Sequence, residues 1–396
     1  MSKIDDLIKE LCPDGVIHRA LWSLTTWDKR FNAVDNNKQP KVKKYFYFLA
    51  NDLKPLILKN GDIKILTTSV SNVYTSSKLV DSNRIAEGEV VCIPWGGNPI
   101  VQYYNGKFIT ADNRICFSND DTYLSNKYLY YVLTSKLDEI KTFYRGSGIK
   151  HPNMQKVLDL KIPVPPLEVQ KEIVRVLDSF TELEAELEAE LEARKKQYEY
   201  YRNTLMAFGD SVAWKPMGEV TDNFDRLRKP VTRSERTKGK YPYYGANGIQ
   251  DYVNDYIFDG VYLLLGEDGS VKNKDGSPIV NWAEGKIWVN NHAHVLQAKS
   301  NALILRFIYF YLQTIDISPY VTGGTQPKIN QKNMNSIKIP IPNLEKQKQI
   351  VSILDKFEKL TNDISIGLPA EIEARRKQYE YYRNKLLTFK ELECSK

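Results

Sequence analysis

The chain contains few cysteines and no long run of hydrophobic residues. Only four of its 396 residues are cysteines (Cys12, Cys92, Cys116 and Cys394), and no two form a Cys-x-x-C pair. This spacing argues against a disulfide framework and a zinc site, and it predicts reduced thiols. The mean hydropathy of −0.45 and the lack of an apolar run argue against a membrane span. The opening MSKIDDLIKELC lacks the apolar stretch of a signal peptide, so we expect a cytoplasmic protein.

Common catalytic motifs are missing as well. The sequence has no G-x-G-x-x-G, no P-loop and no H-E-x-x-H, and its four histidines leave little room for acid–base catalysis. The spacing of Asp275, Glu284 and Lys286 is loosely nuclease-like, but it lacks the usual preceding proline and such spacing often arises by chance. His292 and His294 share one face of an expected strand, with no third metal ligand nearby in the sequence. The sequence therefore favours a binding protein without a metal, cofactor or catalytic site.

The clearest positive feature is an internal duplication. Residues 161–180 (KIPVPPLEVQKEIVRVLDSF) match residues 338–357 (KIPIPNLEKQKQIVSILDKF) at 13 of 20 positions. Residues 192–208 (EARKKQYEYYRNTLMAF) match residues 373–389 (EARRKQYEYYRNKLLTF) at 13 of 17 positions. Chance does not produce such pairs. The chain therefore divides into two variable blocks, residues 1–160 and 210–337, each followed by one copy of a repeated module, residues 161–209 and 338–396.

Both modules are predicted to be long helices. No Gly or Pro interrupts Leu167 to Phe208, which corresponds to roughly 60 Å of helix. Its apolar stripe needs a partner, and the obvious partner is the duplicate from Leu344 to Phe389. We expect an intramolecular antiparallel coiled coil, which relates the two copies by a pseudo-two-fold axis. The residues expected in the helix pair or at a partner contact are Leu177, Leu187, Leu191, Tyr198, Arg202, Leu354, Tyr379 and Arg383; the tyrosines favour packing, and the arginines fit either role.

The modules differ in length between their matched ends. The first has TELEAELEAELEA, and the second has EKLTNDISIGLPAEIEA, which is four residues longer. Gly367 and Pro369 are expected to break or kink the second helix. Either the surplus residues bulge out of the helix, or the tetrapeptide run in the first copy sets the length of a spacer.

Both variable blocks mix strand-like and helix-like runs. The strand-like runs are Lys64–Ser69, Val90–Ile93, Phe108–Phe117, Val261–Leu265, Ile287–Asn290 and Val295–Ala298. The helix-like runs are Tyr123–Lys136 and Leu303–Thr314, and each precedes a Gly-rich loop. These patterns predict a mixed α/β (α+β) fold, used twice with different surfaces.

Basic residues alternate with aromatic ones near the start of each block. The net charge of +7 is modest, so local clustering has to carry any argument for nucleic-acid binding. One basic run is usually a solvated loop, but two in duplicated blocks favour contacts with a phosphate backbone. Two lysines in Gly-rich loops are further candidates, because backbone N–H groups there can face an anion. The candidate contacts are Lys38, Lys41, Lys43, Lys44, Tyr45 and Lys150 in the first block, and Arg226, Arg228, Arg233, Lys238, Lys240, Tyr243, Tyr244, Asn247, His292 and Lys328 in the second.

Over its full length the chain resembles the specificity (S) subunit of type I restriction-modification systems. The resemblance rests on the repeated K-I-P-x-P-x-L-E-x-Q-K-x-I-V-x-x-L-D-x-F, followed in each copy by R-x-K-Q-Y-E-Y-Y-R-N. In the second block it also rests on YPYYGANGIQDYV, GVYLLLGEDGSV, WVNNHAHVL and GGTQPKINQKNM. The first block matches less closely, through LTTSVSNVY and FITADNRICF.

The resemblance implies that each variable block is a target-recognition domain for one half of a bipartite site in double-stranded DNA. The repeated helices would act as a spacer and as the docking surface for two methyltransferase (M) subunits. These subunits would bring S-adenosylmethionine, and restriction (R) subunits would use ATP and Mg²⁺, so this chain would hold no cofactor and catalyse no reaction. A helix pair of roughly 60 Å is long enough to hold two domains over major-groove faces about 34 Å apart.

Two other classes of protein remain open on the sequence. An autonomous DNA endonuclease would use Asp275, Glu284 and Lys286 for metal-dependent cleavage. A protein-interaction scaffold would bind partners through the helix pair and show no salt-dependent affinity for DNA.

Overall fold

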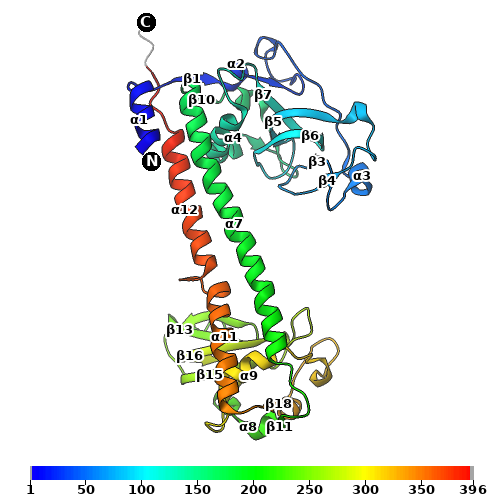
Figure 1. Cartoon of the computed structure of the whole chain (residues 1–396), viewed down its shortest axis with the longest axis vertical. Helices are drawn as coiled ribbons and strands as arrows, with labels where there is room; N and C mark the ends of the chain where they lie inside the picture. Colours follow the sequence, from blue (N-terminus) through cyan, green and yellow to red (C-terminus); the bar gives the residue numbers. More distant parts are fainter. Residues whose placement is uncertain (1, 393–396) are drawn as a thin grey trace. The chain divides into compact units, whose positions relative to one another are not determined.

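The structure is a computed structural model that describes residues 2–392, so Cys394 lies outside the described residues (Figure 1). The chain forms two compact units: unit 1 comprises Met1–Glu186 and Glu373–Lys396, and unit 2 comprises Leu187–Ile372. Each unit contains one variable block together with part of both repeated modules. The sequence suggested four consecutive segments, with each repeated module as a segment of its own. In the structure each module is instead divided between the two compact units.

Unit 1 is built on a six-stranded mixed sheet. Its strands are β2 (Thr25–Trp27), β3 (Ile63–Leu66), β4 (Tyr74–Thr75), β5 (Ala86–Pro94), β6 (Gln102–Thr110) and β7 (Asn113–Ser118), in the order β2-β7-β5-β6-β3-β4. Strands β3 and β6 are parallel, and the other neighbouring pairs are antiparallel. The remaining elements that precede the long helix are α1 (Ser2–Leu11), β1 (Ile17–Ala20), α2 (Leu21–Leu24), η1 (Asn36–Lys38), α3 (Ala50–Leu53), η2 (Lys54–Leu56), η3 (Ser82–Arg84), α4 (Asn126–Ser135), α5 (Leu137–Thr142), β8 (Tyr144–Arg145), β9 (His151–Pro152), α6 (Met154–Asp159) and β10 (Lys161–Val164).

Unit 2 repeats this topology strand for strand. Its sheet contains β12 (Thr221–Asn223), β13 (Lys238–Gly245), β14 (Gly248–Val253), β15 (Phe258–Gly266), β16 (Val280–Val289) and β17 (Ala293–Ala298), in the order β12-β17-β15-β16-β13-β14. Strands β13 and β16 are the parallel pair. Its other elements are β11 (Ala213–Pro216), α8 (Met217–Val220), η4 (Asp225–Leu227), α9 (Leu305–Leu312), η5 (Ser318–Tyr320), α10 (Gln331–Ser336) and β18 (Lys338–Ile341). The prediction of one mixed fold used twice is therefore confirmed.

The repeated Lys-Ile-Pro segment forms the same short sheet in both units. In unit 1, β10 pairs antiparallel with β1, so that Ile17 lies opposite Val164. In unit 2, β18 pairs antiparallel with β11, so that Ala213 lies opposite Ile341. The segment therefore closes each variable block by pairing with a strand near its start.

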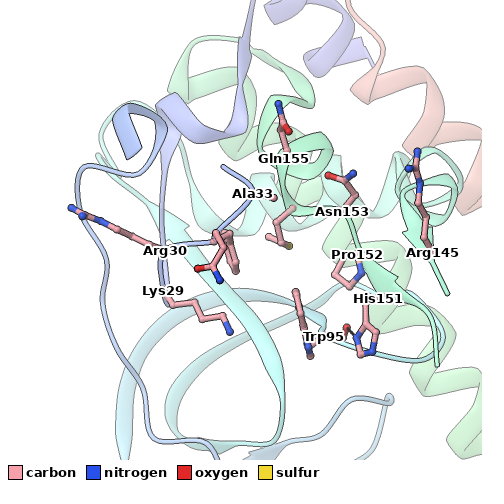
Figure 2. A pocket seen from close by; sticks show the side chains of 12 residues that line it. Lys29, Arg30, Ala33, Trp95, Arg145, His151, Pro152, Asn153 and Gln155 are labelled. Carbon is pink, nitrogen blue, oxygen red and sulfur yellow. Dashed lines mark hydrogen bonds between the residues drawn. The ribbon is translucent and has the colours of Figure 1, made fainter. Parts of the chain in front are cut away.

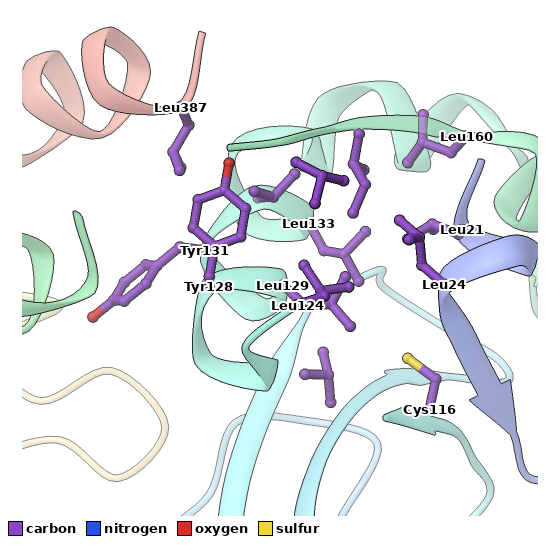
Figure 3. Close-up of a cluster of buried hydrophobic side chains, with 14 of the residues drawn as sticks. Leu21, Leu24, Cys116, Leu124, Tyr128, Leu129, Tyr131, Leu133, Leu160 and Leu387 are labelled. Atoms are coloured by element: carbon purple, nitrogen blue, oxygen red, sulfur yellow. The ribbon is translucent and has the colours of Figure 1, made fainter. Parts of the chain in front are cut away.

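The core of unit 1 forms between α4 and the sheet. Tyr128, Leu129 and Val132 of α4 are fully buried against Val91 of β5 and Cys116 of β7. Figure 3 shows Tyr128 and Leu129 in this cluster together with side chains from α2 and α12. The burial of these apolar side chains is the main force that holds the helix on the sheet. Unit 2 has an equivalent core under α9.

Three cysteines lie inside unit 1. Cys12, Cys92 and Cys116 are buried and free. Burial raises the pKa of the Cys92 thiol to about 12, so this thiol stays protonated at neutral pH. A buried, protonated thiol behaves as a small apolar side chain and is a poor metal ligand.

A buried glutamine joins each variable block to the helix that follows it. Gln170 lies in α7 (Leu167–Leu205), accepts a hydrogen bond from the backbone N–H of Ser125 (2.9 Å) and donates to the carbonyls of Tyr123 and Pro165 (2.8 Å each). In unit 2, the corresponding Gln347 lies in α11 (Leu344–Asn362), and its three partners are the N–H of Ile304 and the carbonyls of Ala302 and Pro342. Both glutamines are fully buried, and every partner is a backbone group.

An ion pair repeats the same connection further along each helix. Lys127 of α4 lies 3.2 Å from Asp178 of α7, and Arg306 of α9 lies 2.7 Å from Asp355 of α11. Gln170 and Asp178 in the first module correspond to Gln347 and Asp355 in the second. Residues that are identical in the two modules therefore hold each variable block on its helix.

Within unit 1, α7 packs antiparallel against α12 (Leu368–Leu387). Phe180 stacks on Tyr382 with ring centroids 5.4 Å apart, and Glu184 accepts a hydrogen bond from Arg376 (2.6 Å). Contacts therefore move backward along α12 as they move forward along α7, which confirms the expected antiparallel pairing. Within unit 2, Tyr201 of α7 stacks on Phe357 of α11 at 5.5 Å.

The second module is broken where the sequence predicted. The structure has two helices there, α11 and α12, and the residues between them, Asp363 to Gly367, are not helical. Asp363 Oδ1 accepts hydrogen bonds from the backbone N–H of Ser365 (2.7 Å) and of Ile366 (3.3 Å), which stabilise a turn. The surplus residues of the second copy therefore leave the helix, whereas the tetrapeptide run of the first copy stays helical throughout α7.

One expected strand is two strands. The run from Phe108 to Phe117 turns at Ala111 and Asp112, which separate β6 from β7. The turn contains no Gly or Pro, so its local sequence signal is limited to Asp112 and the adjacent Asn113. No helix within residues 2–392 is both long enough and apolar enough to cross a membrane.

The buried glutamine generates a first prediction. Gln347→Ala should lower the free energy of unfolding of the full chain by about 2–3 kcal/mol, because it leaves buried backbone groups without hydrogen-bond partners. Urea-induced unfolding followed by tryptophan fluorescence measures this change. Gln349→Ala is the matched control, because Gln349 lies two residues further along the same helix and is exposed. It should change the free energy of unfolding little. Equal losses of stability in both variants would contradict the interpretation.

Candidate nucleic-acid interface

Three loops meet at the same edge of both sheets, held by the same backbone hydrogen bonds. In unit 1, the N–H of Trp95 donates to the carbonyl of Asp112 (2.9 Å), and the N–H of Gly97 donates to Lys150 (3.0 Å). In unit 2, the N–H of Glu267 donates to His292 (2.8 Å), and the N–H of Gly269 donates to Pro327 (3.1 Å). We call this arrangement the loop frame. The Gly-rich loops singled out in the sequence belong to it in both units.

One carboxylate anchors each loop frame to the sheet, Asp28, which is buried, in unit 1 and Asp225, which is half-buried, in unit 2. In unit 1, Asp28 accepts a hydrogen bond from the N–H of Ile115 (3.0 Å) and forms an ion pair with Arg114 (2.8 Å). In unit 2, Asp225 accepts from the N–H of Val295 (2.9 Å), and its other oxygen lies 2.6 Å from Nδ1 of His294. Arg114 and His294 occupy equivalent positions of β7 and β17, so one anchor uses a permanent cation and the other a titratable one.

The two anchors differ in their acidity. Burial raises the pKa of Asp28, although Tyr47 and Arg114 oppose this shift. Burial also works against the ionisation of Asp225, but the hydrogen bond and charge of His294 outweigh it, so the pKa of Asp225 is lowered. Nε2 of His294 lies 2.8 Å from the carbonyl of Ile329 and Nδ1 faces the carboxylate. Because both partners only accept hydrogen bonds, a doubly protonated imidazolium satisfies both ring nitrogens.

His294 has acidic neighbours that the sequence did not reveal. Among residues 2–392, Asp225, Glu267 and His294 form a group whose ligand atoms lie within 4.8 Å of one another. The expectation that no third metal ligand lies near His294 is therefore corrected. Arg228 lies 2.5 Å and Lys328 3.2 Å from Glu267. These side-chain cations already neutralise the acids, so the group works as an internal ion-pair network.

The first-block candidates lie on or near the surface of unit 1. Lys41, Lys43, Lys44 and Lys150 are exposed. Lys43 also lies over the ring of Tyr45, 5.6 Å from its centroid. Lys38 is half-buried and forms an ion pair with Asp159. Tyr45 is half-buried, and burial of its hydroxyl raises its pKa.

Apart from two tyrosines, the second-block candidates fall into two groups. The first group is exposed: Asn247 is neutral, and Arg226, Arg233, Lys238 and Lys240 form no ion pair with any residue from 2 to 392. The others are held by acids of the loop frame: Arg228 and Lys328 by Glu267, and His292 by Asp268. The first group is free to meet phosphates, whereas the second shapes the loops.

Two tyrosines need correction. Tyr243 is only 1% exposed, and its hydroxyl accepts a hydrogen bond from the N–H of Val231 (3.0 Å). Tyr244 is 8% exposed in a separate cluster of buried side chains. Both side chains are largely buried in this conformation, so the structure exposes little of either ring for a DNA contact.

The helix-pair candidates lie along the helix contacts inside each unit. Leu177 and Leu354 are fully buried, Tyr198 is buried, and Leu187, Leu191 and Tyr379 are half-buried. Arg202 donates to Gln313 (2.9 Å) and stacks on Tyr198. Arg383 stacks on Tyr379 in the same manner. The two arginines therefore occupy equivalent packed positions.

The nuclease-like pattern is not assembled into a site among the described residues. Asp275 accepts hydrogen bonds from Ser277 and stabilises a turn, while Glu284 accepts one from Trp282 (2.6 Å). Neither belongs to the group of clustered metal-ligand side chains around His294. Both carboxylates therefore have local structural roles.

Sequence reasoning missed a cavity of about 480 Å³ beside the loop frame of unit 1 (Figure 2). Lys29, Arg30, Arg145 and His151 line it together with Trp95. These residues come from three distant segments, and none belongs to a basic run, so no local pattern could have identified them.

The anchor of unit 2 generates a second prediction. Asp225→Asn should lower the free energy of unfolding by about 3 kcal/mol at pH 7, because it leaves the buried His294 and the half-buried Arg228 without their carboxylate. The pKa of Asp225 is lowered in the fold, so the stabilisation is complete above the ordinary value of about 3.9 and is lost as the pH falls through the folded value. The difference in the free energy of unfolding between wild type and Asp225→Asn should therefore be smaller near pH 3.5 than at pH 7.

Asp222→Asn, on the exposed face of β12, is the control and should change little at either pH. A penalty for Asp225→Asn that is the same at both pH values would rule out charge as its cause.

Comparison with known proteins identifies the family. Residues 36–193 and 212–374 both match the family described as Type I restriction modification DNA specificity domain. A putative type I restriction enzyme specificity subunit from Haemophilus influenzae is 43% identical over 46% of this chain and 48% of its own length, about half of that protein. The EcoR124I/EcoR124II specificity subunit from Escherichia coli is 35% identical over 69% of this chain and 73% of its own length.

Solved structures agree on the fold. The S subunit of a type I restriction-modification system from M. genitalium has a TM-score of 0.64 at 18% identity, covering 94% of this chain and 96% of that chain. A chain from a study of complex assembly and conformational transition of a type I system has a TM-score of 0.51 at 15% identity, covering 95% and 98%. With both variable blocks matched, this chain belongs to the family of type I restriction-modification DNA specificity domains.

Proposed function

We propose that this chain reads DNA sequence for a type I restriction-modification complex, with each unit contacting one half of a bipartite site. The observation that carries the proposal is the loop frame. Two units share one topology and one set of backbone hydrogen bonds, yet Trp95, Asp112 and His151 stand where Glu267, His292 and Lys328 stand. One scaffold with two different surfaces suits two different half-sites.

In this proposal the exposed cations hold the phosphate backbone. Lys41, Lys43, Lys44 and Lys150 would serve unit 1, and Arg226, Arg233, Lys238 and Lys240 would serve unit 2. Such contacts position a protein on DNA and make its affinity salt-dependent, but they do not specify the sequence. Sequence would be read by side chains of the loop frame that reach base edges.

The catalytic steps would belong to other subunits. We propose that the helices α7, α11 and α12 dock two methyltransferase subunits, which bind S-adenosylmethionine, and that restriction subunits using ATP and Mg²⁺ join them. The chain would act in the cytoplasm and catalyse no reaction itself. The family membership supports this division, as do the local structural roles of Asp275 and Glu284.

The first test exchanges one unit's block. Replacing residues 210–337 with the same block of another family member, together with the cognate methyltransferase, should change one half of the methylated motif and leave the other half unchanged. Adenine methylation mapped across the genome of the expressing cell measures both halves. An exchange that leaves the motif unchanged, or the absence of any motif, would contradict the proposal.

The second test shortens α7. Deleting Leu183–Glu186 removes one Leu-Glu-Ala-Glu repeat from the helical run, which shortens the helix by about 6 Å. Because base pairs stack about 3.4 Å apart, the spacer between the half-sites should become one or two base pairs shorter while both half-sites stay the same. An unchanged spacer in the methylation map would mean that the helix does not set the distance.

A further inference from the structure

The cavity of unit 1 combines an apolar floor with a cationic rim. Phe31 and Met154 are buried at its base, and Trp95 is half-buried beside them. Lys29, Arg30 and Arg145 are exposed at its edges, and Figure 2 shows Lys29 reaching toward the side where Trp95 and His151 lie. Among the residues that the structure describes, none of the three cations forms an ion pair. Unlike Arg228 and Lys328 in unit 2, they are available to an external partner.

His151 adds a hydrogen-bond acceptor to this rim. Its Nδ1 lies 2.8 Å from the carbonyl of Trp95, and its ring packs on the Trp95 ring with centroids 5.3 Å apart. A carbonyl only accepts hydrogen bonds, so Nδ1 carries a proton, and in the tautomer protonated at Nδ1 alone Nε2 has a free lone pair. The cavity therefore offers hydrogen-bond donors from three cationic side chains and one acceptor at Nε2 of His151. The ammonium group of Lys29 lies 5.2 Å from the centroid of the Trp95 ring.

The corresponding place in unit 2 is built from other side chains. Glu267 stands at the position of Trp95, and Lys328 stands at the position of His151. Glu267 is paired with both Arg228 and Lys328, so internal ion pairs occupy the place where unit 1 has an open cavity. The backbone hydrogen bonds are the same in both units. The two units therefore place different chemistry on equivalent backbone hydrogen bonds at this position.

We infer that this cavity is where unit 1 reads a base pair, and that the pair is G·C read through guanine. In the major groove, guanine presents two acceptors and its cytosine presents one donor. Arginine and lysine are the side chains that commonly recognise guanine, and Lys29 and Arg145 supply them from opposite segments of the rim. Nε2 of His151 is the matching acceptor for the cytosine amino group. The inference rests on the proposed function and adds to it the residues and the base.

The test uses the full chain expressed with its cognate methyltransferase subunit in a cell without other adenine methylation. Arg145→Ala and Lys29→Ala are compared with wild type and with Lys59→Ala, an exposed lysine of unit 1 outside the cavity. The block exchange described above assigns one half-site to unit 1. All the altered side chains are exposed, so equal thermal unfolding temperatures should verify that each variant is folded.

The inference expects a guanine in the half-site assigned to unit 1. Arg145→Ala and Lys29→Ala should each lower the preference for guanine at that position about 10- to 100-fold, with the other half-site unchanged and Lys59→Ala silent. A uniform loss of methylation with an unchanged motif would show that these cations contact phosphate, and it would overturn the inference while the proposed function stands. A half-site without guanine would also overturn it. Absence of any motif in wild type would remove the proposed function and the inference together.

Discussion

A buried glutamine side chain is the constraint on which both units depend. Gln170 and Gln347 use their amide groups on backbone N–H and carbonyl groups alone, at the point where the variable block meets its helix. Backbone groups are present whatever side chains surround them, so this connection is independent of the block's sequence. The ion pairs Lys127–Asp178 and Arg306–Asp355 and the short β1–β10 and β11–β18 sheets then fix the same junction at further points.

The same principle separates structure from recognition at the loop frame. Its shape comes from backbone hydrogen bonds and from one carboxylate per unit, Asp28 or Asp225. Its surface chemistry comes from side chains that those bonds do not involve. Among the described residues, Lys29, Arg30 and Arg145 form no ion pair at the cavity of unit 1, whereas Glu267 pairs with Arg228 and Lys328 at the same place in unit 2. The two surfaces therefore differ in their ion pairs although the fold beneath them is the same. This explains how the fold repeats while the blocks differ in sequence.

Much of the fold was predictable from the sequence, because its signals are local. The duplication, the long helix α7 and the break near Gly367 and Pro369 all depend on neighbouring residues, and the structure has each of them. The site was much less predictable. Lys29, Trp95, Arg145 and His151 are brought together only by folding, and so are Asp225, Glu267 and His294. Tyr243 and Tyr244 suggested an interface because basic residues precede them, but Val231 and Arg236 contact Tyr243, and Tyr244 packs in a cluster with Phe258 and Tyr262.

The loop frame also bears on how such proteins diversify. A substitution at the exposed rim of the unit 1 cavity alters no backbone hydrogen bond and empties no core, so selection can act on it almost free of any stability penalty. New specificities can accumulate by single steps, each leaving a folded protein. In unit 2 fewer substitutions are tolerated, because replacing Glu267 leaves both Arg228 and Lys328 without their ion-pair partner. A lineage starting from this chain should therefore drift faster in its first block than in its second.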